Sequence, residues 1–173
     1  MNHKNLLILL FIAFLISCNK EKSTTAEVKK ITVTTIKTVN YKQLQPLLEK
    51  KDDTIYVINF WATWCAPCVK ELPYFEKLGA AYSSRNVKVL LVSLDFPKQV
   101  KSKLIPFIND HKIQSEVVLL DDVNEDIWIQ AIDKTWSGAL PATLIYNKNK
   151  RKFYEQTFDY ETLENELNQF LKP

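Results

Sequence analysis

Residues 54–73 read TIYVINFWATWCAPCVKELP, and this stretch joins an apolar run to two closely spaced cysteines. The run at 54–61 is short and rich in β-branched and aromatic side chains, which is typical of a strand buried on both faces. A loop begins at Thr63 and leads into a predicted helix that ends at about Tyr82 and contains Pro73, a kinking residue. Cys65 and Cys68 therefore lie where a buried strand gives way to a helix.

The position of the two cysteines favours redox chemistry. A helix amino terminus carries partial positive charge and unpaired N–H groups, so a thiolate there has a pKa below its ordinary value of about 8.5. We expect Cys65, at the exposed start of the helix, to attack a substrate disulfide. Cys68, one turn further in, then resolves the mixed disulfide by attacking Cys65. Pro67 fits the first turn because its missing N–H has no partner there.

Other uses of a Cys-x-x-Cys motif find less support. A zinc site needs about four ligands, and only His111, which we expect to cap a helix end, remains to help the cysteines. Haem attachment requires a histidine directly after the second cysteine, where this chain has Val69. A purely structural disulfide stays possible, although closing so short a loop removes little chain entropy.

The rest of the chain alternates strands with helices, which predicts an α/β fold with a central mixed sheet and parallel crossovers. An N-terminal β-α extension precedes the buried strand, and a C-terminal hairpin and helix close the domain. Asp95, Asp121 and Asp122 follow strands and are interpreted as loop residues. Strands are predicted at 31–39, 54–61, 87–95, 117–120, 142–146 and 152–156, and further helices at 41–50, with Asn40 as its N-cap, 98–111, 124–132 and 162–171.

The first 30 residues are interpreted as a targeting signal followed by a tether. Residues 6–16, LLILLFIAFLI, are too few to span a bilayer, which takes about 20 residues, and are typical of a signal peptide. The following Ser17-Cys18 resembles a bacterial lipobox, which implies cleavage after residue 17 and a lipid on Cys18. An uncleaved anchor or an ordinary signal peptide are the alternatives. Residues 18–30 are polar and predict a flexible tether, so residues 31–173 form the predicted domain.

Composition excludes several classes of partner. The chain has 23 Lys and Arg against 20 Asp and Glu, a net charge of +3 that is spread along the sequence, so nucleic acid is not expected as a partner. Its two glycines, Gly79 and Gly138, are too few and too far apart for a Gly-rich phosphate loop. A nucleotide site of that kind is therefore excluded.

Residues 59–73, NFWATWCAPCVKELP, resemble the active-site stretch of the thioredoxin fold, and in particular the TlpA/ResA-like branch of exported thiol–disulfide oxidoreductases. The resemblance extends more weakly over residues 31–173. It implies that Cys65 is the nucleophile and Cys68 the resolving thiol, with no cofactor beyond their disulfide. It also implies that Pro141 is a cis-proline that faces the two cysteines and offers a strand-like edge to the substrate backbone.

Proton handling differs from that of thioredoxin itself. Thioredoxin has a buried aspartate where this chain has Asn59, and an amide cannot ionise. The ResA-like branch has a glutamate three residues after the second cysteine, and Glu71 stands there, on the same helix face as Cys68. We expect a partly buried Glu71 to have a raised pKa and to exchange a proton with Cys68. The alternative is a solvated helix residue.

The client-binding surface is predicted from residues that flank the cysteines. Trp64, Ala66, Pro67 and Leu140 are expected to contact the client. Leu140 replaces the more usual threonine or valine of the family, and Gly138 lies three residues before the proline rather than two, so the shape of this loop departs from the pattern. Trp61 is expected in the core. Trp128 and Trp136 could line a groove, but core packing is favoured for both.

Taken together, these features predict a lipid-anchored, extracytoplasmic protein that exchanges dithiols for disulfides in protein clients. The Ala-Pro dipeptide lacks the histidine of strongly oxidising relatives, so the resemblance favours a reductant recharged by a membrane electron donor. An oxidase or isomerase is the alternative within this class. A peroxidase would need a threonine and an arginine near its cysteine, and the only arginines are Arg85 and Arg151. A redox-inert binding module is the alternative from a different class.

Overall fold

The computed structural model describes residues 32–171, so the predicted signal peptide, Cys18 and the tether lie outside the described residues. At its centre is one six-stranded sheet in the order β1-β4-β3-β2-β5-β6. The first four strands in that order run parallel; β5 pairs antiparallel with β2, and β6 pairs antiparallel with β5. The strands are β1 (Lys37–Val39), β2 (Ile55–Trp61), β3 (Val87–Ser93), β4 (Glu116–Leu120), β5 (Ala142–Tyr146) and β6 (Arg151–Tyr154).

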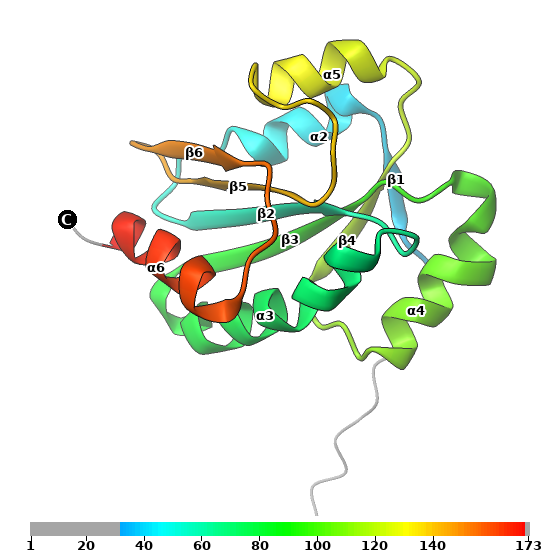
Figure 1. Cartoon of the computed structure of the whole chain (residues 1–173), viewed down its shortest axis with the longest axis horizontal. Helices are drawn as coiled ribbons and strands as arrows, with labels where there is room; N and C mark the ends of the chain where they lie inside the picture. Colours follow the sequence, from blue (N-terminus) through cyan, green and yellow to red (C-terminus); the bar gives the residue numbers. More distant parts are fainter. Residues whose placement is uncertain (1–31, 172–173) are drawn as a thin grey trace, which may run out of the picture. The chain divides into compact units, whose positions relative to one another are not determined.

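Helices cover both faces of this sheet (Figure 1), which confirms the predicted α/β fold with a mixed sheet and a C-terminal hairpin. One face carries α2 and α5, and the other carries α3, α4 and α6. The helices are α2 (Tyr41–Leu48), α3 (Ala66–Tyr82), α4 (Ile105–Asp110), α5 (Glu125–Ile132) and α6 (Tyr160–Leu171).

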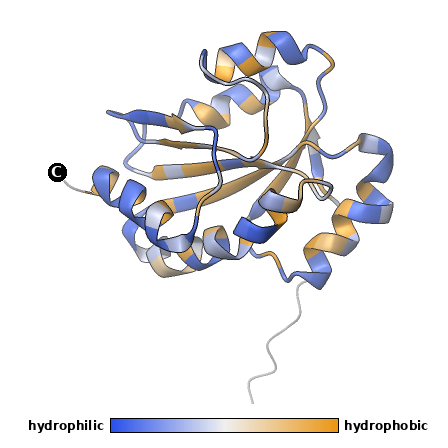
Figure 2. Ribbon diagram, viewed as in Figure 1, coloured by the Kyte–Doolittle hydropathy of each residue, from blue (hydrophilic) through white to orange (hydrophobic). Residues whose placement is uncertain are grey.

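The central strand β2 is buried along its whole length, as its apolar sequence predicted. Because successive side chains point to opposite faces, β2 contributes to two apolar clusters. Val57 and Trp61 pack with Phe75 of α3, whereas Ile58 and Phe60 pack on the side of α2 and α5. Figure 2 shows the apolar residues concentrated on the strands and on the inner sides of the helices. This double burial fixes the position from which the cysteine loop leaves the sheet.

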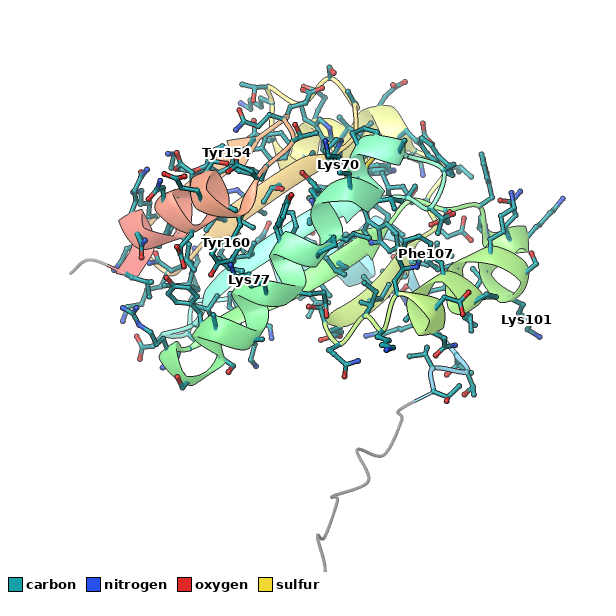
Figure 3. All side chains as sticks on the ribbon, turned by 60° about the horizontal axis from the view of Figure 1, so that its bottom comes forward. Lys70, Lys77, Lys101, Phe107, Tyr154 and Tyr160 are labelled. Atoms are coloured by element: carbon teal, nitrogen blue, oxygen red, sulfur yellow. A yellow bond between two sulfur atoms is a disulfide. The ribbon has the colours of Figure 1, made fainter. Side chains whose placement is uncertain are left out.

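The terminal helix α6 is held against α3 by polar and aromatic contacts. The ammonium group of Lys77 lies 3.5 Å from the ring centre of Tyr160, and the two residues face each other in Figure 3. The hydroxyls of Tyr82 and Tyr160 both donate to the carboxylate of Glu164, at 2.9 and 2.8 Å. These contacts fix the segment that enters α6, which becomes important for the site below.

Asn40 begins α2 as the sequence predicted. Its side chain accepts a hydrogen bond of 3.0 Å from the amide of Gln43, and the Gln43 side chain accepts one of 3.0 Å from the amide of Asn40. This reciprocal pair is a capping box, which satisfies two helix N–H groups that would otherwise lack partners. A typical N-cap of this kind contributes about 1 kcal/mol.

Two predicted elements differ from the structure. The first strand was predicted over 31–39, but β1 comprises only Lys37–Val39, because it is an edge strand paired through these three residues alone to β4. The helix predicted over 98–111 divides into a 3₁₀ turn at Pro97–Gln99, a π-helical turn at Val100–Leu104 and then α4. Pro106 explains the division, since it has no amide proton to donate to the preceding turn.

The remaining predictions differ only at the ends of elements. The second hairpin strand, predicted at 152–156, is β6 at 151–154, and the terminal helix begins two residues earlier than its predicted start at 162. The turn between β5 and β6 is closed by a hydrogen bond of 2.9 Å from the amide of Asn147 to the carbonyl of Lys150. The helix α3 continues through Pro73 to Tyr82.

Candidate active site

The amino terminus of α3 carries both cysteines of the motif. Cys65 is the N-cap, and its carbonyl accepts a hydrogen bond of 3.0 Å from the amide of Val69. Pro67 lies in the first turn, as predicted. Cys65 and Cys68 are joined by a disulfide, with their Cα atoms 5.3 Å apart. The amide of Cys68 donates to the sulfur of Cys65 at 3.4 Å, so the helix directs a backbone donor at the first sulfur.

The two cysteines differ slightly in their exposure to solvent. Cys68 is fully buried, and Cys65 is 6% exposed. The sequence predicted an exposed Cys65, which was wrong for the residue as a whole. Cys65, bonded to Cys68, instead packs in the apolar core at the start of α3. The remaining surface of Cys65 opens into a groove.

This groove, the active-site groove, has a volume of about 770 Å³. It is formed by the connections that follow β2, β3 and β4 and by the connection that precedes β5. The carboxyl ends of adjacent parallel strands meet at one edge of a sheet, so residues distant in sequence come together there. The four residues predicted to contact the client all line the groove; they are Trp64, Ala66, Pro67 and Leu140. Trp64 is 56% exposed.

The connection into β5 contains the proline singled out by the resemblance. The peptide bond between Leu140 and Pro141 is cis, as the resemblance implied. Leu140 contributes to the groove, whereas Pro141 is buried. Gly138 has a φ of +94°, a conformation that residues with a Cβ rarely adopt. This glycine therefore permits the path by which the connection reaches the proline.

Glu71 lies behind the disulfide, three residues beyond Cys68, and only 1% of its surface is exposed. One carboxylate oxygen accepts a hydrogen bond of 2.9 Å from the side-chain amide of Asn59, and the other accepts one of 2.7 Å from the backbone amide of Phe158. Burial raises the pKa of Glu71 to about 7, and the hydrogen bonds from Phe158 and Asn59 lower it only in part. The predicted burial and raised pKa are confirmed, while proton exchange with Cys68 stays a prediction.

Asn59 connects this carboxyl to the strand that follows the cis-proline. It is fully buried in β2 opposite Thr143 of β5. Its amide nitrogen donates to Glu71 and also to the hydroxyl of Thr143, at 3.2 Å, while its carbonyl oxygen has no hydrogen-bond partner among the described residues. Asn59 is therefore a donor to the buried carboxyl, in the position where thioredoxin has an ionisable group.

Asp95 was missed by sequence reasoning. It is buried just beyond β3, and its carboxylate accepts hydrogen bonds of 3.1 and 3.2 Å from the amide of Thr63. It also accepts from the hydroxyls of Thr63 and Ser93. Asp95 thus ties the loop that carries Cys65 to the neighbouring strand. The only signal in the sequence was a pair of polar residues, Ser93 and Asp95, at the end of an otherwise apolar strand.

The tryptophans outside the motif occupy the positions favoured by the sequence. Trp61 and Trp136 are fully buried or nearly so. Trp128 is also buried and packs in the same apolar cluster as Trp136. Trp128 also contributes to the active-site groove, so both interpretations hold for this residue. His111 ends α4 as predicted, and its ring nitrogen lies 3.0 Å from the carbonyl of Phe107.

Two further properties concern the described part of the chain. No helix among residues 32–171 has both the length and the apolar character needed to cross a bilayer. Within the same residues, no three His, Cys, Asp or Glu side chains gather closely enough to hold a metal ion.

A sequence model of the AhpC/TSA family matches residues 20–151. The chain belongs to the AhpC/TSA family. This family member is 32% identical over 92 residues to the thiol-disulfide oxidoreductase ResA of Geobacillus thermodenitrificans, across 53% of this chain and 48% of that relative. It is 30% identical over 115 residues to ResA of Bacillus anthracis, across 66% and 60% of the two chains. The chain spans about half the length of the curated relatives it matches.

Solved structures give the same fold for this AhpC/TSA family member. StoA from Bacillus subtilis superimposes with a TM-score of 0.52 and 26% identity, covering 67% of this chain and 81% of StoA. A thioredoxin-related protein from Neisseria meningitidis serogroup B superimposes with a TM-score of 0.59 and 21% identity, covering 69% and 86%. The comparisons confirm the thioredoxin-like fold and the resemblance to ResA-type proteins.

Proposed function

We propose that this protein is a thiol–disulfide oxidoreductase that reduces disulfides of extracytoplasmic proteins. The observation that carries the proposal is the Cys65–Cys68 disulfide at the amino terminus of α3, with Cys65 open to a groove and Cys68 closed off behind it. A nucleophile needs access to a client, and a resolving thiol needs access only to the nucleophile. The similarity to proteins named thiol-disulfide oxidoreductase supports the same reaction class.

The reaction exchanges one disulfide for another. In the reduced protein the Cys65 thiolate attacks one sulfur of a client disulfide, whose S–S bond breaks and releases the first client sulfur as a thiolate. The Cys68 thiolate then attacks the sulfur of Cys65, which releases the second client sulfur and closes the disulfide seen here. Two electrons pass from the protein to the client, and each client thiolate takes up a proton. The N–H of Cys68 and the positive end of α3 favour the attacking thiolate.

Glu71 is proposed as the group that takes the proton from Cys68. Cys68 is fully buried and must lose its proton before it can attack, so a base inside the protein serves it better than bulk water. A carboxyl with a pKa of about 7 is partly ionised at neutral pH and both accepts and returns a proton. Under this proposal, Glu71→Gln shifts the pH profile with which the reduced protein reacts with an alkylating agent, and an unchanged profile contradicts it.

The remaining parts of the proposal concern the client and the cellular setting. Trp64, Ala66, Pro67 and Leu140 contact the client, and Pro141 aligns its backbone, in keeping with their positions in or beside the groove. The apolar run before Cys18 supports export and lipid attachment at that cysteine. Because each turnover leaves the protein oxidised, a donor of two electrons in the membrane must regenerate it. An oxidase would use the same groove with the electrons flowing the other way, and an isomerase would use it with no net transfer of electrons.

A peroxidase is an alternative enzyme class on the same fold. The positions of the two arginines argue against it. A peroxidatic cysteine needs a cationic partner beside it. Arg151 donates instead to backbone carbonyls at the ends of α2 and α5, at 3.0 and 2.8 Å. Arg85 lies over the ring of Tyr82 at the far end of α3. Neither arginine lines the active-site groove.

Reduction of insulin disulfides in the presence of dithiothreitol tests the function. We expect the wild-type protein to accelerate the reaction and Cys65→Ser to lower the rate to that of dithiothreitol alone. Equal rates for the two proteins would support a redox-inert binding module instead. In cells, Cys68→Ala should accumulate mixed disulfides through Cys65, because the resolving step is lost, and their identification would name the client.

A further inference from the structure

The charges around the active-site groove are all of one sign. Beyond the buried Asp95, its lining includes Asp121, Asp122 and Glu125, and it includes no lysine, arginine or histidine. The chain as a whole carries a net charge of +3. A second hollow of about 800 Å³, at the opposite end of β3, is lined by both acidic and basic side chains. The groove beside the disulfide is therefore acidic in an otherwise slightly basic protein.

Asp121 and Glu125 face solvent, and Asp122 is held by two backbone amides. The backbone amides of Asn124 and Tyr41 each donate to the carboxylate of Asp122 at 3.0 Å and hold the pKa of Asp122 below its ordinary range. Asp121 and Glu125 are exposed and accept no hydrogen bond on their side chains from the described residues. The first turn of α5 favours an acid at Glu125 on its own account, but Asp121 lies outside any helix.

Large apolar side chains are exposed around the same groove. Trp64 follows β2, Phe96 follows β3 and Val123 follows β4, and their exposed fractions are 56, 60 and 91%. All three line the groove. Exposed apolar residues that converge from separate loops mark a surface that another molecule covers. Here they surround Cys65, the member of the disulfide that is not fully buried.

We propose that the active-site groove binds a client polypeptide in which lysine or arginine residues, together with apolar residues, flank the disulfide to be reduced. This inference rests on the proposed function and adds the chemical class of its substrate. The exposed apolar residues supply contact area that is indifferent to charge. The acids on and beside the β4–α5 connection discriminate between clients by charge. They attract cationic segments and repel anionic ones, both during encounter and in the complex.

Two disulfide-containing peptides of equal length test the preference, one with lysines and the other with glutamates beside its cysteines. The rate of oxidation of the reduced protein is measured at low salt and at high salt. We expect the lysine peptide to react about tenfold faster at low ionic strength, with the ratio approaching one at about 1 M salt, where the screening length is only about 3 Å. Equal rates for both peptides at low salt overturn the proposal.

Charge-neutralising variants locate the preference. In Asp121→Asn/Glu125→Gln the ratio of the two rates should fall to about twofold, with Asp122 left as the remaining acid. The matched control, Asp110→Asn/Glu161→Gln, removes two exposed acids of α4 and α6 that do not line the groove, and its ratio should stay near tenfold. A tenfold ratio in the groove variant, or an equal loss in the control, overturns the proposal.

Two further measurements separate the possible failures. A peptide with serines beside its cysteines reports the exchange reaction without a charge preference. If it reacts while the charged peptides react equally, the substrate class is wrong and the proposed function stands; if none of the peptides reacts, the proposed function itself fails. Sedimentation of the wild-type protein at low and high salt tests a second copy of this chain as the occupant. A salt-sensitive dimer that is lost in Asp121→Asn/Glu125→Gln assigns the groove to self-association and overturns the proposal.

Discussion

The side-chain amide of Asn59 donates a hydrogen bond of 2.9 Å to the carboxylate of Glu71, and both residues are buried in the core behind the disulfide. An amide donor stabilises the ionised form of a carboxyl, whereas burial disfavours it. In Glu71 burial has the larger effect, and the result is a pKa of about 7. Asn59 therefore lowers the pKa of Glu71 toward neutral pH, against the effect of burial, without adding a second ionisable group of its own.

Replacing Asn59 with alanine should raise the pKa of Glu71 further, because one of the two donors that lower it is lost. NMR titration of the glutamate side-chain carboxyl signals in the oxidised protein measures the midpoint directly. Glu71→Gln identifies the signal by its disappearance. A midpoint that is unchanged or lower in Asn59→Ala contradicts the assigned role of the amide.

Glu71 should also make stability depend on pH in an unusual direction. Its pKa rises from an ordinary 4.5 in the unfolded chain to about 7 in the folded protein, so the folded state holds more protons between these values. The contribution of Glu71 is therefore fully present below pH 4.5 and is lost as the pH rises through about 7. The loss amounts to about 3 kcal/mol.

Urea denaturation of the oxidised protein across this pH range measures the effect. The comparison is between the wild-type protein and Glu71→Gln, which cannot titrate at this position. Wild type should lose stability relative to the variant as the pH rises from about 5 to about 8. A constant difference between the two proteins would show that the folded and unfolded chains share the same pKa.

Asp95→Asn should loosen the loop that carries Cys65. The substitution replaces a carboxylate that accepts from Thr63 and Ser93 by an amide with one oxygen, and a buried donor loses its partner. The expected cost is about 1–3 kcal/mol of unfolding free energy, measured by urea denaturation. Asp110→Asn serves as the control, since Asp110 is exposed. Equal stabilities of the two variants would contradict the structural role of Asp95.

Gly138→Ala should destabilise the connection that leads into β5. The residue has a φ of +94°, and an added Cβ would lie 3.2 Å from the Cδ1 atom of Ile129. A residue with a Cβ in such a conformation costs about 1–3 kcal/mol. The thermal midpoint of the oxidised protein should fall accordingly. Gly79→Ala is a useful comparison, because its added Cβ would also lie 3.2 Å from a side-chain carbon, Cγ2 of Val89, whereas its backbone is that of α3, where alanine is intrinsically favoured.

The sequence was sufficient for the central part of the fold because its signals there are local. A strand buried on both faces has few polar residues, and residues 54–61 have that character. The capping box of Asn40 and the position of Pro67 likewise depend on residues within one helical turn. The predicted start of β1 and the single helix predicted over 98–111 were wrong, because strand pairing and the geometry of neighbouring turns are set by tertiary contacts.

The site contains contacts that no local pattern encodes. Thr63 and Asp95 are 32 residues apart, and Glu71 and Phe158 are 87 residues apart. In the second pair the donor is a backbone amide, which every residue except proline possesses, so the identity of Phe158 carries no signature of the contact. The burial of Cys65 was also unpredictable, since it is set by packing against core residues from other parts of the chain.

The hydrogen bond from the amide of Phe158 links the environment of Glu71 to a part of the chain that is synthesised late. Both cysteines and Glu71 leave the ribosome long before residue 158, which supplies one of the two donors to that carboxyl and leads into the helix that closes over α3. We expect the glutamate to be solvated, with the acidity of an ordinary carboxyl, until those last residues are in place. Under the proposed role of Glu71, a nascent or C-terminally clipped chain would possess the two thiols but lack the internal base, and full reactivity would require the last residues of the domain.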